Sequence, residues 1–284
     1  MALAAKRATG ASFLFDMRGF WADERVDGNL WRADGRLYRA AKRAERKLLL
    51  AADHVVTLTH ASEAELRRWP YLQERMPPIT VIPTCADLDR FTIRKPPQRD
   101  PFVLGYVGSV GTWYLLDEML HCFVLLKRQR PDARLLIVNR SEHALIKERL
   151  DAAHIDRASV ELIAADHSEM PAQMARMSAA MALIKPAYSK IASAATKLAE
   201  YLGCGVPCLG NRGVGDMAEI LEQHRVGVAV PGFGGEDLEQ GMRRLIALAC
   251  EESIQERCRS TAVELFSLKA GTEAYGEIYD SLRR

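Results

Sequence analysis

The residues best suited to chemistry lie in one short stretch, Ser193–Lys197, which reads Ser-Ala-Ala-Thr-Lys. Its small side chains let the backbone approach a ligand, and we expect a helix to begin near Thr196. The unpaired N–H groups and the positive dipole end of that helix favour an anion such as phosphate. Lys197 adds a full positive charge in the first turn. Glu200 follows one turn later, where its carboxylate could accept hydrogen bonds from a ribose. These residue types and their spacing predict a nucleotide-diphosphate site.

A glycine-rich segment, Gly105–Thr112, follows one expected strand and precedes an expected helix. Glycines in such a turn let backbone N–H groups reach a phosphate, although a tight strand-to-helix turn is the alternative reading. The matching loop at Ser193–Lys197 favours phosphate. Trp113 and Tyr114 come directly after the turn, so the positive charge must come from Lys197, from Lys190 and from helix ends.

For two of the carboxylates, Glu200 and Asp216, a purely structural role is an alternative to ligand binding. Glu200 could be a surface residue of its helix, but the apolar residues around it predict a well-buried helix and favour a carboxylate that faces the crevice. Asp216 ends the turn Gly213-Val-Gly-Asp before another expected helix. It is either the N-cap of that helix or a group near the nucleotide and its sugar.

A charged cluster of Asp16, Arg18, Asp23 and Glu24 follows the expected strand Ser12–Phe15. In an open α/β sheet, ligands bind beyond the carboxyl ends of the strands, so an acceptor sugar could meet this cluster. The alternative is a solvated loop.

At this point the chain resembles a known family. Residues 185–207 are similar to the donor-site motif of family 4 glycosyltransferases, which are retaining enzymes of the GT-B fold. The resembling subgroup has the pattern Ser-x-x-Thr-Lys-x-x-Glu-Tyr-Leu-x-x-Gly-x-Pro. The more widespread pattern has two glutamates, of which Glu200 matches the second, whereas the first falls at Ala192. Further matches lie at residues 16–24, 81–91, 105–114 and 213–216.

The residues and the resemblance together give a candidate site. The residues expected to take part in the reaction are Asp16, Arg18, Lys197 and Glu200. Those expected to bind the nucleotide sugar are Gly108, Ser109, Gly111, Thr112, Lys190, Ser193, Thr196, Lys197, Glu200 and Asp216. The resemblance implies transfer with retention of the anomeric configuration, no essential metal, and a nucleotide sugar that is a substrate rather than a cofactor.

The element pattern predicts an α/β protein of two Rossmann-like domains. Residues 1–98 hold three expected strands and a linker, and read as an N-terminal, acceptor-side domain that lacks its first part. Residues 99–265 hold six expected strands and read as a complete nucleotide-sugar-binding domain. Residues 266–284 resemble the helix that crosses back to the N-terminal domain in GT-B proteins. The polar, proline-rich stretch 94–101 is the expected linker.

Composition limits the alternatives. With 284 residues, 48% hydrophobic residues and 27% charged ones, the chain reads as a globular protein with no span or signal peptide. A net charge of +2 gives no argument for nucleic acid. The six cysteines are expected to be small core residues in a reducing compartment.

We expect sugar transfer from a nucleotide-diphosphate sugar to a glycan or lipid-linked acceptor in polysaccharide or cell-surface glycan assembly. The expected location is cytoplasmic. The basic helix within residues 32–47 could rest on anionic lipid, although a solvated face explains it too. One alternative is a non-catalytic nucleotide-sugar-binding module, or a half that needs a partner chain. Another is a GT-B epimerase, which would need additional cleft carboxylates and histidines.

Overall fold

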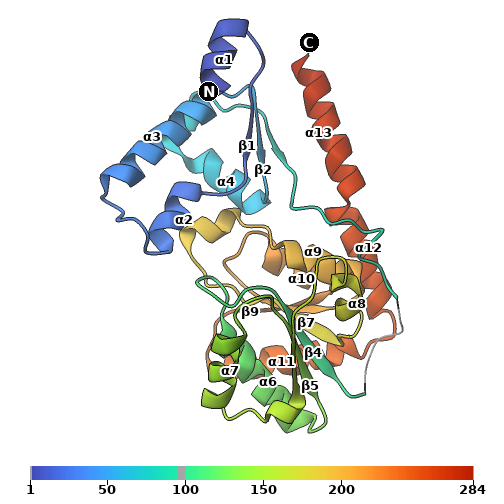
Figure 1. The fold of residues 1–284 in the computed structure, drawn as a ribbon. Coiled ribbons are helices and arrows are strands. Elements are labelled where there is room, and N and C mark those ends of the chain that lie inside the picture. The colour runs from blue at the N-terminus through green and yellow to red at the C-terminus, as the bar shows by residue number, and fades with distance from the viewer. Residues whose placement is uncertain (1, 95–99, 284) are drawn as a thin grey trace.

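The computed structural model describes residues 2–94 and 100–283. Within them the chain forms two parallel β-sheets, each covered by helices, with a long C-terminal helix beside the smaller sheet (Figure 1). Residues 95–99 hold most of the expected linker and the expected boundary between residues 98 and 99, and they lie outside the described part of the chain.

The N-terminal sheet has three strands in residues 2–94, in the order β1-β2-β3. They are β1 (Leu14–Met17), β2 (His54–Thr57) and β3 (Ile79–Val81). Helices connect them, as parallel pairing requires. These helices are α2 (Trp21–Asp27), α3 (Arg36–Ala51), α4 (His60–Arg68) and α5 (Pro70–Gln73), and α1 (Ala2–Thr9) precedes β1.

The C-terminal sheet has the order β6-β5-β4-β7-β8-β9. Its strands are β4 (Val103–Val107), β5 (Arg134–Val138), β6 (Val160–Ile163), β7 (Ala179–Met181), β8 (Cys208–Asn211) and β9 (Gly227–Val230). The covering helices are α6 (Leu116–Gln129), α7 (His143–Ala152), α8 (Met170–Met174), α9 (Thr196–Gly203), α10 (Met217–Gln223) and α11 (Gly235–Ala249). Short 3-10 helices are η1 (Arg157–Ser159) and η2 (Tyr188–Ala192). The strand order reverses between β4 and β7, which is where such sheets bind ligands.

Two apolar clusters cover the faces of the C-terminal sheet. One packs α9, α10 and α12 (Ile254–Phe266) against one face, and the other packs α6 and α11 against the opposite face. Buried strands such as Arg134–Val138 are nearly continuous apolar runs because both faces are covered. Of the six cysteines, Cys122, Cys204, Cys208 and Cys258 are buried, and all six are unpaired.

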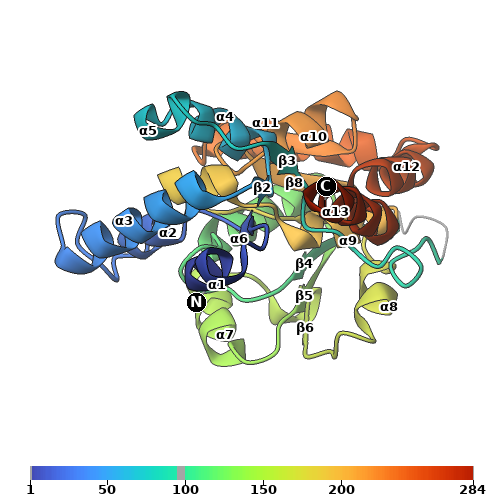
Figure 2. The same cartoon turned by 90° about the horizontal axis from the view of Figure 1, so that it is seen from above.

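The expected crossover helix is α13 (Leu268–Leu282). It leaves the C-terminal sheet after α12 and packs on the N-terminal sheet, where Ile278 is buried with Val56 and Ile82. The Ser12 hydroxyl donates a hydrogen bond of 2.8 Å to the Leu282 carbonyl. Figure 2 shows α13 next to β2 and β3. The α/β fold with two Rossmann-like sheets and a crossover helix is therefore confirmed.

Two expected elements differ in detail. The sequence Ser62-Glu63-Ala64-Glu65 has the pattern of a capping box, which predicts a helix that starts near Ser62. In the structure α4 begins at His60 and its N-cap is Thr59, whose hydroxyl accepts from the Ser62 N–H at 3.0 Å. The apolar run Met181–Ile184 predicts a strand over those residues, but the strand there is β7, which ends at Met181. The reason is that the Ile184 N–H donates to the Asn211 side chain at 2.8 Å, so a side chain rather than a strand takes this amide.

Candidate functional site

A pocket of about 250 Å³ opens where the strand order reverses. We call it the Lys197 pocket. Its lining consists of Glu24, Trp113, Tyr114, Ala182, Ile184, Lys190, Ser193, Ala194, Ala195, Thr196 and Lys197. The structure thus brings four of the predicted binding residues together: Lys190, Ser193, Thr196 and Lys197. It adds Glu24 from the N-terminal part of the chain, which sequence reasoning had grouped with Asp16.

The start of α9 has the features expected of an anion site. The helix begins at Thr196 as predicted, and no side chain caps its N-terminus at Ala195. Its first N–H groups therefore remain without a capping side chain. The Lys197 ammonium lies 3.2 Å from the Tyr114 hydroxyl and 4.6 Å from the centre of that ring. A full charge and a helix dipole consequently act on the same small volume.

Gly108 lets Lys197 reach this position. Its backbone has φ of +132°, and a Cβ added there would lie 2.1 Å from Lys197 Cε. A side chain at residue 108 would collide with the lysine. The glycine turn therefore makes room for the cation. This is a different reason for glycine from the close approach to phosphate that the sequence suggested.

The rest of the turn is anchored from the next strand end. The Val110 N–H donates to Glu142 at 2.9 Å, and the Asn139 amide donates to Glu142 and to the Gly108 carbonyl, each at 2.9 Å. The Gly108 N–H donates to the Val138 carbonyl at 2.9 Å. The backbone N–H groups of Gly108 and Val110 are thus already hydrogen-bonded within the protein, so they are not free to bind a phosphate. Ser109, Gly111 and Thr112 are exposed beside the Lys197 pocket but do not line it.

Lys190 is the other basic residue of the pocket. Its side chain is only 8% exposed, and its ammonium lies 2.8 Å from Glu24 and 3.7 Å from the centre of the Trp113 ring. Cations over aromatic faces are stabilised by about 0.5–2 kcal/mol. Trp113 and Tyr114 therefore each support a lysine. Because Glu24 already neutralises Lys190, Lys197 is left as the pocket's main source of positive charge.

Glu200 lies one turn further along α9. Its carboxylate is 13% exposed, and burial raises its pKa above the ordinary value of 4.5. The His167 ring, on the loop after β6, lies 3.7 Å from this carboxylate. The Arg90 guanidinium donates to the His167 carbonyl at 3.1 Å. His167 was not predicted, because the histidine spacing in the sequence gives no signal for this contact.

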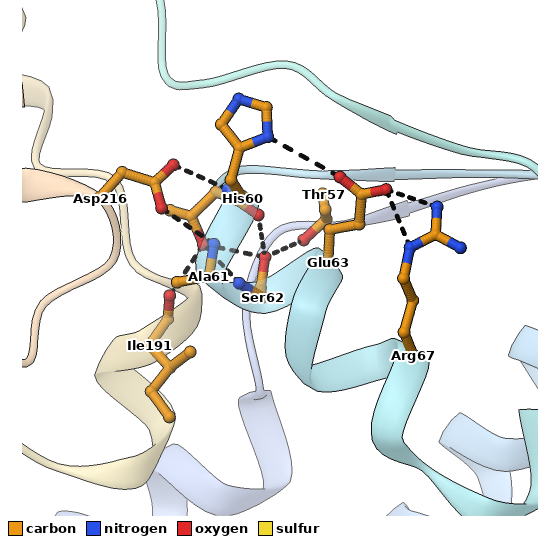
Figure 3. Close-up of polar contacts among 9 residues, drawn as sticks. Thr57, His60, Ala61, Ser62, Glu63, Arg67, Ile191 and Asp216 are labelled. Atoms are coloured by element: carbon orange, nitrogen blue, oxygen red, sulfur yellow. Dashed lines mark hydrogen bonds and ion pairs between the residues drawn. The ribbon is translucent and has the colours of Figure 1, made fainter. Parts of the chain in front are cut away.

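Asp216 makes contacts that the sequence did not predict (Figure 3). One carboxylate oxygen accepts from the His60 N–H at 2.7 Å and the other from the Ala61 N–H at 2.9 Å. These are first-turn amides of α4, so Asp216 joins α10 to the N-terminal part of the chain. Asp216 stands at the N-cap position of α10 but makes no side-chain capping bond there. Any nucleotide contact would have to compete with these two bonds.

Asp16 and Arg18 lie in another pocket, of about 500 Å³, which we call the Asp16 pocket. Its lining consists of Phe15, Asp16, Met17, Arg18, Gly19, Trp21, Ala22, Glu24, Ala41, Ala44, Glu45 and Leu48. Burial, together with Asp16, raises the pKa of Tyr275 on α13 to about 12. The four residues expected to react are therefore not in one cluster: Asp16 and Arg18 line the Asp16 pocket, Lys197 lines the Lys197 pocket, and Glu200 lies near His167.

Comparisons with known proteins identify the family of the chain and its fold. Residues 89–263 match the family model described as glycosyl transferases group 1. The match covers more than half of the chain. The chain belongs to this family. Among curated proteins, no match was found.

Solved structures confirm the GT-B fold. The chain is 19% identical to sucrose-phosphate synthase from Thermosynechococcus elongatus, with a TM-score of 0.75 over 95% of this chain and 67% of that one. A glycosyltransferase from Rickettsia africae gives 17% identity and a TM-score of 0.73, over 99% and 73%. The Anabaena protein HepE, solved with UDP and glucose, gives 13% and 0.67, over 98% and 73%.

No group of three or more His, Cys, Asp or Glu side chains is placed to hold a metal ion in residues 2–94 and 100–283. Across the same residues, no helix combines the length and the apolar character needed to span a membrane.

Proposed function

We propose that this glycosyltransferase moves a sugar from a nucleotide-diphosphate sugar to a glycan or lipid-linked acceptor in polysaccharide or cell-surface glycan assembly. The observation that carries the proposal is the position of Lys197. It lies in the first turn of an uncapped helix, over a glycine turn, where the strand order reverses. Lys197 also falls within the segment that matches the family.

The geometry supports a specific division of roles. In sugar transfer the departing diphosphate gains negative charge, and fixed positive groups stabilise it. Lys197 and the first N–H groups of α9 supply those groups. Glu200 would hold the ribose. The acceptor would enter through the Asp16 pocket, which borders the Lys197 pocket at Glu24.

Retention of configuration is part of the proposal. In this mechanism the acceptor hydroxyl attacks from the side of the leaving group, and a diphosphate oxygen accepts its proton. No strong base is then required beside the reacting carbon. Lys197 and the start of α9 suit such a reaction, because they stabilise the leaving group that serves as the proton acceptor.

A cytoplasmic location at the inner membrane face fits a lipid-linked acceptor. Helix α3 carries the exposed cations Arg36, Arg39, Arg43 and Lys47, and Leu37 between them is 64% exposed. Cations with an exposed apolar residue suit contact with anionic lipid. Lys42 of the same helix is not included among these lipid-facing cations, because its ammonium pairs with the Asp23 carboxylate at 2.9 Å.

The experiment is a screen of nucleotide sugars. UDP-, GDP- and ADP-sugars are incubated with the chain and with extracted glycan and lipid acceptors, and release of the nucleoside diphosphate is measured. We expect release from one class of donor, with the anomeric configuration of the product unchanged. The binding of UDP, GDP and ADP is measured by calorimetry on the same preparation. No release from any donor, together with no binding of any of the three diphosphates, would contradict the proposal.

The second candidate is a donor-binding module that needs a partner chain for transfer. The observation in its favour is that β1, at the edge of the described N-terminal sheet, pairs only with β2. An unpaired edge can accept a strand from another polypeptide. Tight donor binding without any turnover would favour this candidate.

A further inference from the structure

Within residues 2–94 and 100–283, Glu24 alone lines both the Lys197 pocket and the Asp16 pocket. It belongs to α2, in the N-terminal part of the chain, and it contacts Lys190 in the C-terminal part at 2.8 Å. The two partners differ in exposure: the Lys190 side chain is 8% exposed and that of Glu24 is 43% exposed. The ion pair therefore fixes the carboxylate without covering it.

Because Glu24 lines both pockets, it must lie at the side of the Lys197 pocket that faces the Asp16 pocket. Thr196 and Lys197 mark the end that suits phosphate, because the helix start and the ammonium lie there. Glu24 marks the side that opens towards the Asp16 pocket. A nucleotide sugar with its diphosphate at Lys197 would place its transferred sugar between these two ends.

The chemistry at this position suits a sugar. A carboxylate accepts hydrogen bonds from hydroxyl groups, and an indole offers an apolar face to the C–H groups of a sugar ring. Among the described residues that line the Lys197 pocket, Glu24 is the only carboxylate. Trp113 lines the same pocket, with the Lys190 ammonium 3.7 Å from the centre of its ring. The segment Ser193–Ala195 contributes only small side chains to this lining.

We propose that Glu24 recognises the hydroxyl groups of the transferred sugar. This inference rests on the proposed function and assigns its sugar specificity to a residue outside the family-matched segment 89–263. Lys190 is the positioning residue that holds the carboxylate in place, and the Trp113 ring supports Lys190. Sugar recognition then requires both parts of the chain, because the diphosphate is held by one part and the sugar by the other.

The test compares Glu24→Gln and Glu24→Asp with the wild type. Glu24→Gln keeps the shape of the side chain and removes its charge. Glu24→Asp keeps the charge but moves the carboxylate away from the pocket by one methylene group. The matched control is Asp27→Asn. Asp27 also lies on α2 and accepts from the Ser189 N–H at 2.8 Å, but it lines neither pocket. Thermal melting of every variant shows whether it is folded.

The readout is the ratio of two dissociation constants, one for a nucleotide sugar and one for its nucleoside diphosphate. UDP-glucose with UDP, GDP-mannose with GDP and ADP-glucose with ADP are titrated by calorimetry. We expect both Glu24 variants to raise this ratio about tenfold, as a lost charge-assisted hydrogen bond would. Affinity for the diphosphate alone should stay within about twofold in Glu24→Asp, which keeps the charge beside Lys190. Glu24→Gln leaves Lys190 without its carboxylate, so it should strengthen the binding of diphosphate and nucleotide sugar alike, while the ratio of the two dissociation constants still rises. Asp27→Asn should leave the ratio unchanged.

The outcomes separate the inference from the function. If the wild type binds none of the diphosphates or their sugars, the proposed function fails, and the inference with it. If the wild type binds them and the ratio is unchanged in both Glu24 variants, Glu24 does not contact the sugar and the function stands. An equal change in Asp27→Asn would show a general effect of α2 docking, which also overturns the inference.

Discussion

At the scale of single residues, Lys197 is the group on which the diphosphate site depends. Its ammonium is held by Tyr114 and passes over Gly108, and α9 begins beside it. The other lysine of the pocket is neutralised by Glu24. Positive charge for a ligand therefore comes from one side chain and one helix start.

Lys197→Ala should weaken the binding of UDP, GDP and ADP by roughly 10- to 100-fold, because a charge-assisted hydrogen bond contributes about 1.5–3 kcal/mol. Stability should change little, because the side chain is only partly buried. Calorimetric titration measures both proteins, and Lys147→Ala on the exposed face of α7 is the control. Equal affinities in the variant and the wild type would remove Lys197 from the site.

Glu200→Gln should lower the affinity for nucleosides as well as for diphosphates, because a ribose contact is common to both ligands. Uridine, guanosine and adenosine are titrated beside their diphosphates. Unchanged affinity for all of them would make Glu200 a structural residue only.

The stability of Glu200→Gln shows whether a loss of affinity comes from the missing ribose contact or from a damaged fold. Burial raises the pKa of Glu200 above 4.5, so the folded state binds its proton more readily than the unfolded state does. The ionised carboxylate therefore disfavours folding at neutral pH, and glutamine should not lower the melting temperature there. As the pH falls towards 4.5, the free energy of unfolding of the wild type should rise relative to that of the variant.

At the scale of elements, the turn at Gly108 and the start of α9 form one unit. Their contact joins residues almost ninety positions apart, and it needs a glycine because of the lysine that crosses it. The neighbouring Asn139 and Glu142 hold the turn from the end of β5. The site is thus built by three loops at the carboxyl edge of one sheet.

Gly108→Ala should destabilise the fold by about 1–3 kcal/mol and weaken diphosphate binding, because the new Cβ displaces Lys197 and the backbone has positive φ. Gly276→Ala is a matched control, since a Cβ on that α13 residue meets nothing within 4 Å. Helix propensity makes that change neutral or stabilising. Urea unfolding and calorimetry measure both effects. A Gly108→Ala protein that behaves like the control would contradict this account of the turn.

The sequence predicted the elements better than their contacts. Hydrophobic runs and glycine positions located the strands, and the start of α9 at Thr196 was right. The N-cap of α4 was missed, because Thr59 and Ser62 are both good caps and tertiary contacts decide between them. The bonds from Asp216 to His60 and Ala61 span more than 150 residues. No local pattern encodes such a contact, and the same holds for Glu24 with Lys190.

At the scale of the whole molecule, the described N-terminal sheet has three strands and the C-terminal sheet has six. The proposed donor site therefore lies in the middle of a six-stranded sheet, with strands on both sides of it. The Asp16 pocket, in contrast, lies along the edge strand β1. Because the Asp16 pocket is the proposed entry of the acceptor, we expect the incomplete edge of the N-terminal sheet to affect sugar transfer more than donor binding.

We expect this chain by itself to bind donor better than it transfers sugar. A donor-binding titration and a transfer assay on the same preparation give the comparison, and adding a candidate partner chain should raise the transfer rate but not the donor affinity. Full turnover by a monodisperse monomer would contradict this expectation.

Another pocket, larger than the Lys197 pocket, is an alternative site for the nucleotide. It has about 580 Å³ and lies between β3, α10 and α13. Asp216, Glu219 and Glu264 line it together with two histidines. Three carboxylates disfavour a diphosphate electrostatically, so we assign the nucleotide to the smaller Lys197 pocket.

The most direct test is therefore a crystal structure of the chain with the nucleoside diphosphate that it binds best. The account predicts phosphate oxygens within hydrogen-bond distance of Lys197 Nζ and the first N–H groups of α9, with the ribose hydroxyls at Glu200. A diphosphate in the acidic pocket between β3, α10 and α13, or a Lys197 pocket that stays empty at saturating nucleotide, would contradict it.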